Sequence, residues 1–323
     1  MDPLAFFATS RLVIVAGKGG VGKTTVTAAL AVAAAKSGLR VLMVEVEGKS
    51  GLAHLFGRPS LGYDETSVLE GAGASGSGEV LARAITPAAA LLEYLVDHGM
   101  RRISNRLVRG GALDVVATAA PGIEDILVLG KVKQLERGGA VDLILLDAPA
   151  AGHAITFLES ARGLLDAVTV GPINTQARDV MEMLTDEERC SVVLVTLPEE
   201  TPVNELVDTA YSLEDRVGVK LGPVIVNGLY PPRSGMDVDP VVAAEVAGVV
   251  LMQGEAEALR GAAEFRAARV ALQDDQVARL SQRLPLPQLH LPFLFTTDLS
   301  TNDVHALGDA ALDAIAGLGP VPT

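Results

Sequence analysis

Residues 17–24 constrain the fold of this chain more than any other segment. They read Gly-Lys-Gly-Gly-Val-Gly-Lys-Thr and fit the pattern G-x-x-x-x-G-K-[ST] without a mismatch. An apolar run at residues 11–16 precedes them and an Ala-rich stretch at residues 24–36 follows, so they join a predicted strand to a predicted helix. In that setting successive backbone N–H groups surround a polyphosphate at a helix N-terminus. The segment is therefore predicted to bind a nucleotide.

The pattern also assigns roles within this loop. Lys23 is expected to lie on the β- and γ-phosphates, and the hydroxyl of Thr24 is expected to bind Mg²⁺. A second lysine, Lys18, is not needed by an ordinary loop of this kind. It is either a solvated side chain or a cation that reaches a phosphate in a partner subunit. The other residues expected to contact the nucleotide are Gly17, Gly19, Gly20, Val21, Gly22 and Thr25.

A magnesium site of this type needs a carboxylate at the C-terminal end of a neighbouring strand. Residues 142–147 read Asp-Leu-Ile-Leu-Leu-Asp, which places Asp147 at the tip of a predicted strand. An Asp after a strand often caps a helix instead, but beside the loop at residues 17–24 the magnesium interpretation is favoured. The small residues that follow, 148–153, are expected to lie beside the γ-phosphate and to move between nucleotide states.

Short apolar runs alternate with helical stretches along the chain. Near-continuous apolar runs are typical of strands buried on both faces, and their alternation with helices predicts right-handed βαβ units. The expected fold is an α/β, doubly wound, mostly parallel sheet with helical insertions. The predicted strands fall at residues 12–16, 40–46, 143–147, 167–170, 192–196, 224–226 and, more weakly, 289–291.

Two segments interrupt this alternation, at about residues 52–139 and 230–283. Both are expected to be helical insertions in a single nucleotide-binding domain that spans residues 1–323. The first contains a Gly- and Ser-rich stretch at residues 71–78, a composition typical of a flexible loop. Its helices are expected at residues 87–97, 101–108 and 122–137.

The net charge and the cysteine content limit the kinds of ligand and cross-link that are expected. The formal net charge is −14, which disfavours nucleic acid and anionic lipid as ligands. Cys190 is the one cysteine, so no disulfide within the chain and no cysteine-based zinc site within one subunit is expected. No stretch of about 18 uncharged apolar residues predicts a membrane-spanning helix, and the N-terminal residues lack the features of a signal peptide. The chain is therefore expected to be cytoplasmic.

Residues 17–25 resemble the deviant Walker A motif of the MinD/ArsA/nitrogenase-iron-protein class of ATPases. The resemblance implies a dimer in which Lys18 crosses a two-fold interface and supports hydrolysis in the partner's site, as an arginine finger does in trans.

Further segments are similar to the arsenite-pump and tail-anchored-protein-targeting ATPases of that class. Residues 41–56 resemble the first switch, with Glu47 in the place of the family's catalytic Asp, and residues 147–158 resemble the second switch. Residues 121–125 resemble a helix start of that family. Residues 224–227 resemble its Val-Val-Asn, which implies that Asn227, together with the backbone near Pro292, contacts adenine. The Val-Glu-Val-Glu-Gly form of the first switch resembles a bacterial, actinobacterial-like branch.

The resemblance implies a Mg²⁺-dependent dimeric ATPase that binds ATP and ADP and engages a protein client by nucleotide-driven switching. Its expected catalytic residues are Lys18, Glu47 and Asp147, with Mg²⁺ held by Thr24 and Asp147. Because Glu47 is longer than Asp by one methylene, slow turnover is expected; Glu45 competes for the same role. The dimer is homomeric or is formed with a homologous ATPase.

The sequence also allows other functions. The main alternative is a nucleotide-gated scaffold subunit with little turnover, working with a homologous partner. An anion-pump subunit is disfavoured because the chain lacks a cysteine trio for arsenite, and a MinD/ParA-like positioning ATPase is disfavoured by the acidic charge. A client groove is expected, if anywhere, on the helices within residues 87–116, which form either that groove or a subdomain packed on itself.

Overall fold

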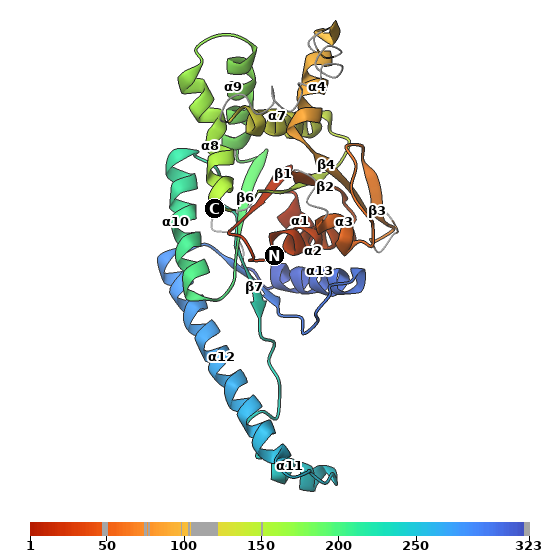
Figure 1. Ribbon diagram of the computed structural model, residues 1–323, viewed down its shortest axis with the longest axis vertical. Coiled ribbons are helices and arrows are strands. Elements are labelled where there is room, and N and C mark those ends of the chain that lie inside the picture. The colour runs from red at the N-terminus through yellow and green to blue at the C-terminus, as the bar shows by residue number, and fades with distance from the viewer. Residues whose placement is uncertain are drawn as a thin grey trace.

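The computed structural model describes residues 1–46, 51–73, 76, 78–97, 99–102, 104, 122–149 and 151–319. Its strands are β1 (Leu12–Ala16), β2 (Arg40–Val46), β3 (Thr66–Glu70), β4 (Glu79–Ile85), β5 (Leu143–Asp147), β6 (Cys190–Thr196), β7 (Val224–Leu229) and β8 (Gln288–Pro292). They form one eight-stranded sheet in the order β3-β4-β2-β5-β1-β6-β7-β8 (Figure 1). Neighbouring strands run parallel except β3 and β4, which are antiparallel. The expected α/β, mostly parallel sheet is confirmed.

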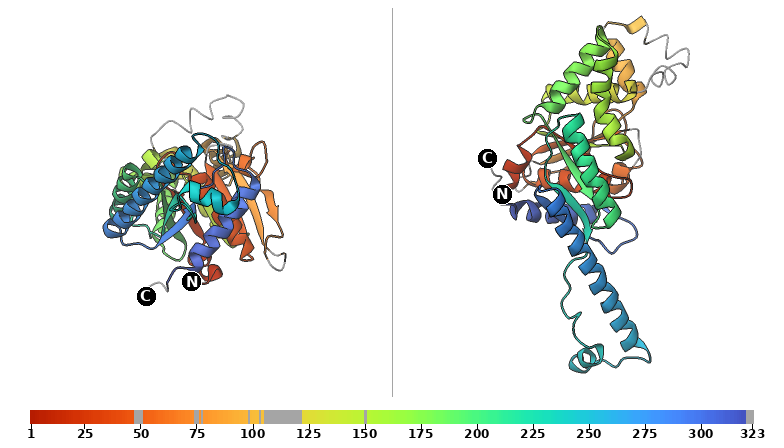
Figure 2. Two further views of the ribbon diagram at one scale, coloured as in Figure 1. Left: turned by 90° about the horizontal axis from the view of Figure 1, so that it is seen from below. Right: turned by 90° about the vertical axis from the view of Figure 1, so that its left-hand side faces the viewer.

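Helices cover both faces of this sheet. One face carries α1 (Pro3–Phe7), α2 (Lys23–Lys36), α3 (Gly51–Leu55) and α13 (Thr301–Ala316). The other carries α7 (Ile123–Gly138), α8 (Ala151–Ala167), α9 (Pro172–Thr185) and α10 (Glu200–Arg216), and α4 (Pro87–Asp97) packs on α7. Two further helices, α11 (Pro240–Ala247) and α12 (Glu255–Arg283), form an arm that projects from the body (Figures 1 and 2). None of the helices in the described ranges combines the length and apolar character needed to cross a membrane.

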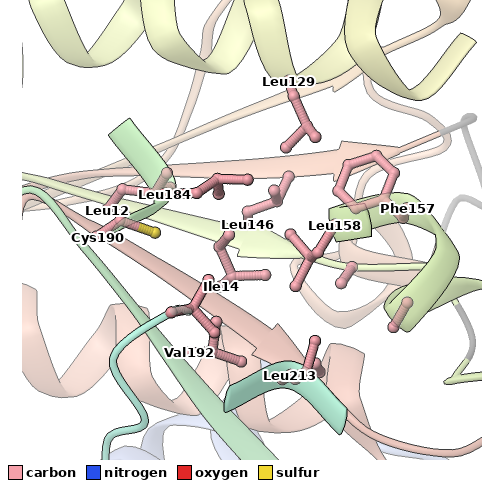
Figure 3. Close-up of a cluster of buried hydrophobic side chains, with 14 of the residues drawn as sticks. Leu12, Ile14, Leu129, Leu146, Phe157, Leu158, Leu184, Cys190, Val192 and Leu213 are labelled. Atoms are coloured by element: carbon pink, nitrogen blue, oxygen red, sulfur yellow. The ribbon is translucent and has the colours of Figure 1, made fainter. Parts of the chain in front are cut away.

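The core between the sheet and α8–α10 is built from side chains of the central strands. Figure 3 shows Ile14 of β1, Leu146 of β5 and Leu158 of α8 near the centre of this layer, with Leu12 of β1 on one side of them and Phe157 of α8 on the other. All five are at most 1% exposed. Burying each such side chain stabilises the fold by about 1.5–3 kcal/mol, so the central strands that position the loop at residues 17–24 are rigid.

One predicted strand is wrong. Residues 167–170 do not join the sheet: α8 continues to Ala167, Val168 N donates to the Leu164 carbonyl at 2.9 Å, and α9 begins at Pro172. A four-residue apolar run fits the end of a helix as well as a short strand, so its composition could not decide between them. Val170 is 79% exposed, which no buried strand would allow.

The segment at residues 52–139 is also less helical than expected. It contributes β3 and β4 to the sheet before the helices begin at α4. The charged Arg83 hides the apolar character of β4, although its side chain is buried. Arg83 is accommodated by Glu65, 3.6 Å from its Nη1, and by the ring of Tyr63, whose centroid lies 4.7 Å from its Cζ.

The other expected helices agree with the structure where it describes them. Residues 87–97 form α4, residues 122–137 correspond to α7, and the segment at 230–283 holds α11 and α12. The helix expected at 101–108 falls mostly outside the described residues. The Gly- and Ser-rich stretch at 71–78 joins β3 to β4.

Gly78 and Gly163 provide a matched test of this packing. A Cβ on Gly78 would lie 1.8 Å from the carbonyl oxygen of Ala35, so Gly78→Ala must push the β3–β4 hairpin away from α2. We expect a loss of about 1–3 kcal/mol in the free energy of unfolding. Gly163 lies within α8 with no atom within 4 Å of its Cβ position, so Gly163→Ala should gain about 0.5–1 kcal/mol. Thermal unfolding measures both; a Gly78→Ala variant as stable as the parent would contradict this packing.

Cys190 is fully buried on β6, beside Leu12 in Figure 3. Burial raises the pKa of its thiol to about 12, and the thiolate is the reactive form. We therefore expect no reaction of the native protein with an aromatic disulfide reagent at pH 8, and one equivalent after unfolding in guanidinium. Rapid labelling of the native protein would show that β6 opens.

Candidate functional site

The loop at residues 17–24 lies at the carboxyl edge of the sheet. It leaves β1 at Ala16 and enters α2 at Lys23. β1 lies between β5 and β6 in the sheet, although β5 and β6 follow it far along the chain. Consecutive strands are therefore added on opposite sides of β1, and an open parallel sheet forms its ligand crevice at such a switch point.

Two glycines of the loop are held where a side chain has no room. A Cβ on Gly17 would lie 2.4 Å from the carbonyl oxygen of Val195 at the end of β6. Gly22 has a left-handed φ of +88°, and its Cβ would lie 2.4 Å from Nδ2 of Asn227. Gly19 and Gly20 are exposed on the loop, whereas Val21 is buried. The loop is thus clamped between β6 and β7, while Gly19 and Gly20 remain open to a ligand.

Lys23 lies inside the loop. It is 9% exposed, and its Nζ donates a hydrogen bond to the backbone carbonyl of Lys18 at 3.1 Å. The first turn of α2 contains no acidic residue. The N–H groups of this turn and the positive end of the helix dipole therefore add to the charge of Lys23, and together they favour an anion. Thr25 lies half-buried in the same turn.

Thr24 and Asp147 meet as the sequence predicts. Thr24 Oγ1 donates to Asp147 Oδ2 at 2.7 Å. Asp147 is the last residue of β5, pairs in register with Val15 of β1 and is 7% exposed. A hydroxyl and a carboxylate are the hard oxygen ligands that Mg²⁺ prefers, so these two side chains fit a magnesium ion beside the phosphate loop.

Of the two carboxylates in the first switch, the structure describes Glu45 but not Glu47. Glu45 is 1% exposed on β2, and its Cα pairs in register with that of Asp147. It is thus a strand-end carboxylate within the sheet edge. Glu47, expected to be catalytic, lies outside the described residues.

Lys18 forms an ion pair within its own chain. Its Nζ lies 3.2 Å from Oε1 of Glu205 on α10, and both side chains are more than one third exposed. An ion pair this exposed contributes little to stability, so Lys18 is free to exchange Glu205 for another anion. The sequence predicted a functional role for Lys18, but it did not predict the ion pair with Glu205.

Asn227 and Pro292, expected near adenine, lie at the carboxyl ends of the adjacent strands β7 and β8. β7 and β8 are paired as far as Leu229 and Pro292. Asn227 Nδ2 also donates to the Val21 carbonyl at 2.9 Å, so Asn227 braces the phosphate loop directly.

Sequence reasoning missed Gln273 of α12. This side chain is 3% exposed; its Nε2 donates to the Gly228 carbonyl at 3.1 Å and its Oε1 accepts from Tyr230 N at 2.9 Å. It therefore joins the arm to the strand end that carries Asn227. A single Gln in a polar helix has no periodicity or motif that would reveal such a contact.

A glycine loop that closes over its own lysine at the switch point of a parallel sheet, next to a strand-end Asp, defines a P-loop nucleotide-binding protein. Residues 10–170 match the family described as anion-transporting ATPase. The chain is also 35% identical over 301 residues to the ATPase BagA of Mycobacterium tuberculosis, covering 87% of each chain. The chain belongs to this ArsA-like ATPase family.

More distant relatives carry other names. The arsenical pump-driving ATPase of Acidiphilium multivorum is 28% identical over 238 residues, which cover 67% of this chain and 39% of that protein. ATPase get3 of Schizosaccharomyces pombe is 27% identical over 184 residues, covering 54% and 53% of the two chains.

Comparing Gly22→Ala with Gly20→Ala separates the energetic cost of the backbone conformation from the cost of a steric clash. Both have a left-handed φ, of +88° and +83°, but only the Gly22 position has Asn227 within reach of an added Cβ. We expect Gly22→Ala to lower the melting temperature of the nucleotide-free protein clearly more than Gly20→Ala, since both variants carry the same cost of about 1–2 kcal/mol for the left-handed conformation. Equal melting temperatures would mean that Asn227 does not clamp the loop.

Proposed function

We propose that the protein is a Mg²⁺-dependent ATPase that hydrolyses ATP to ADP and phosphate and works as a dimer. The observation that carries the proposal is the 2.7 Å contact between Thr24 and Asp147, next to a loop folded around Lys23. Positioning and charge neutralisation account for most of the catalysis of phosphoryl transfer, and these residues supply both.

We assign a role in ATP binding or hydrolysis to each residue of the site. The backbone N–H groups of the loop and Lys23 bind the β- and γ-phosphates. Thr24 and Asp147 hold Mg²⁺, directly or through water; when bound, the ion neutralises phosphate charge. Asn227 and the backbone near Pro292 contact adenine. Orientation of the attacking water is assigned to Glu47 rather than to the buried Glu45.

Lys18 is proposed to act in the partner's site. In a single chain it pairs with Glu205 at the surface, an arrangement that supports a role outside the chain's own phosphate loop. On this proposal, dimer formation replaces Glu205 with a phosphate of the ATP in the opposite subunit. The lysine then stabilises the charge that develops during hydrolysis.

Nucleotide state is proposed to control engagement of a protein client. The segment after Asp147 leads directly into α8, and α8 packs against α7 and α9. Movement beside the γ-phosphate would therefore reach the helical layer, which α4 also contacts. The helices expected within residues 87–116 are one place where such a client would bind.

A nucleotide-gated scaffold with little turnover is the second candidate. Glu47 in place of the family's Asp favours it, because a longer side chain displaces the attacking water and a shift of about 1 Å costs on the order of a hundredfold in rate. On this proposal the chain would pair with a homologous ATPase that supplies the active site.

Mixing two inactive variants tests the dimeric ATPase. Lys18→Ala is expected to lower kcat by about 10³–10⁵-fold while ATP binding is retained, and Asp147→Asn is expected to be inactive as well. In a mixed dimer, one site receives its Asp147 from one chain and Lys18 from the other and is intact. An equal mixture should therefore recover about a quarter of the parent rate.

The outcomes separate the candidates. No recovery on mixing would contradict action of Lys18 across an interface. Equal, very low phosphate release by the parent and Lys18→Ala would favour the scaffold instead. Lys23→Ala, which removes the phosphate-binding cation, serves as the control for loss of ATP binding in a fluorescent-nucleotide titration.

A further inference from the structure

The arm formed by α11 and α12 leaves most of its residues exposed to solvent. α11 has no buried residue, and the 29-residue α12 buries only Gln273 and Leu280. A helix of that length extends about 44 Å, and Figure 2 shows α12 carrying α11 away from the sheet. Nothing in the catalytic proposal uses this extension.

The end of the arm is apolar. Every residue of α11 except Glu245 is apolar, and the turn from α11 to α12 continues Val249-Val250-Leu251-Met252. We name as the tip patch five strongly exposed side chains: Val242 (52% exposed), Val246 (86%), Val249 (58%), Val250 (91%) and Met252 (75%). Clustered apolar side chains on a projecting surface mark a site of interaction, whereas scattered ones do not.

A groove lies next to the tip patch. It has a volume of about 510 Å³ and runs between α11, α12 and the segment that precedes α11. Its lining is mostly small and apolar, and includes Met236, Val238, Ala243, Val249, Leu259 and Ala263. Small side chains in the lining leave space for large apolar side chains of a partner, as in the docking of an amphipathic helix into a groove.

The rim of this surface is acidic. Residues 237–257 contain five acidic side chains and no Lys, Arg or His. Arg260 pairs with Asp239 at 2.8 Å, which leaves Asp237, Glu245, Glu255 and Glu257. Arg233 also lines the groove, so acidic side chains outnumber basic ones around the apolar end. Such a rim attracts basic residues and repels acidic ones, so it selects the charge of whatever covers the patch.

This charge argues against two other occupants. A second copy of the arm would bring the same acidic rim against itself, and an anionic bilayer would repel it. We propose that the tip patch and its groove bind an apolar helix of another protein that is flanked by lysine or arginine residues. The proposal rests on the proposed engagement of a protein client, but not on hydrolysis or on the dimer.

The base of the arm is fixed firmly enough to present such a surface. Gln273 is hydrogen-bonded to Gly228 and Tyr230, and Arg269 pairs with Glu199. Arg266 lies over the ring of Tyr230, with its Cζ 5.2 Å from the ring centroid. Because these contacts hold α12 against the ends of β6 and β7, the tip is a rigid docking element and loses little entropy on binding.

The test uses a fluorescent synthetic peptide, a Leu- and Ala-rich helix with three lysines at each end, titrated by anisotropy with the full-length protein. We expect saturable binding. The triple variant Val246→Ser, Val250→Ser and Met252→Ser should weaken it at least tenfold, because it removes the most exposed apolar side chains of the patch. Val170→Ser is the matched control, since Val170 is 79% exposed outside the arm, and it should leave affinity unchanged.

Further measurements identify which kind of partner the tip patch binds. The same peptide with glutamates at its ends should bind at least tenfold more weakly than the lysine form. Equal affinity for the two peptides, or an unchanged affinity of the triple variant, would overturn the proposal. Tip-dependent self-association in sedimentation, or tip-dependent binding to phosphatidylglycerol vesicles, would overturn it by assigning the patch to a second copy or to lipid.

The ATPase rate of the triple variant shows whether the docking surface and the ATPase activity are independent of each other. We expect that rate and the melting temperature to match those of the parent. An inactive parent protein that still binds the lysine-flanked peptide through its tip would refute hydrolysis but retain the docking surface. If the parent protein hydrolyses ATP but the tip substitutions do not change peptide binding, hydrolysis is retained and the docking surface is refuted.

Discussion

The hydrogen bond between Thr24 and Asp147 connects the two halves of the nucleotide site. It joins the first turn of α2 to the end of β5, two elements separated by 123 positions in the sequence. Strand pairing of β5 with β1 brings these ends together, and the buried side chains on both faces of the sheet keep them there. A phosphate loop could form locally, but its magnesium ligands require this long-range pairing.

Around that site the molecule places two projecting structures at opposite ends. Figure 1 shows α4, α7 and α9 at one end and α11 with α12 at the other, with the sheet between them. Both connect to loop-bearing strand ends: α8 follows β5, and α12 is hydrogen-bonded through Gln273 to the end of β7. A change at the phosphate loop therefore has a physical route to each end, through packed helices on one side and through Asn227 and Gly228 on the other.

Sequence patterns predicted the centre of the fold better than its edges. The strands β1, β2 and β5 agree with prediction because each is a continuous apolar run next to a motif. The edge strand β3 was missed because it is short and only half-buried, so it is not an apolar run. Its neighbour β4 was missed because the charged Arg83 interrupts its apolar run; Arg83 is buried through its contacts with Glu65 and Tyr63. The short run at 167–170 was assigned to a strand because four residues cannot distinguish a strand from the end of a helix.

The sequence by itself determined the phosphate loop, the Asp at the tip of β5 and the parallel α/β class, since each depends on residues close together in the chain. Tertiary structure decided the partner of Lys18, the clamp of Asn227 on a carbonyl 206 positions away and the separation of α11 from the core. An apolar stretch such as α11 looks like core in any sequence. Only the path of the chain leaves it in water, because among the described residues no element folds back to bury it.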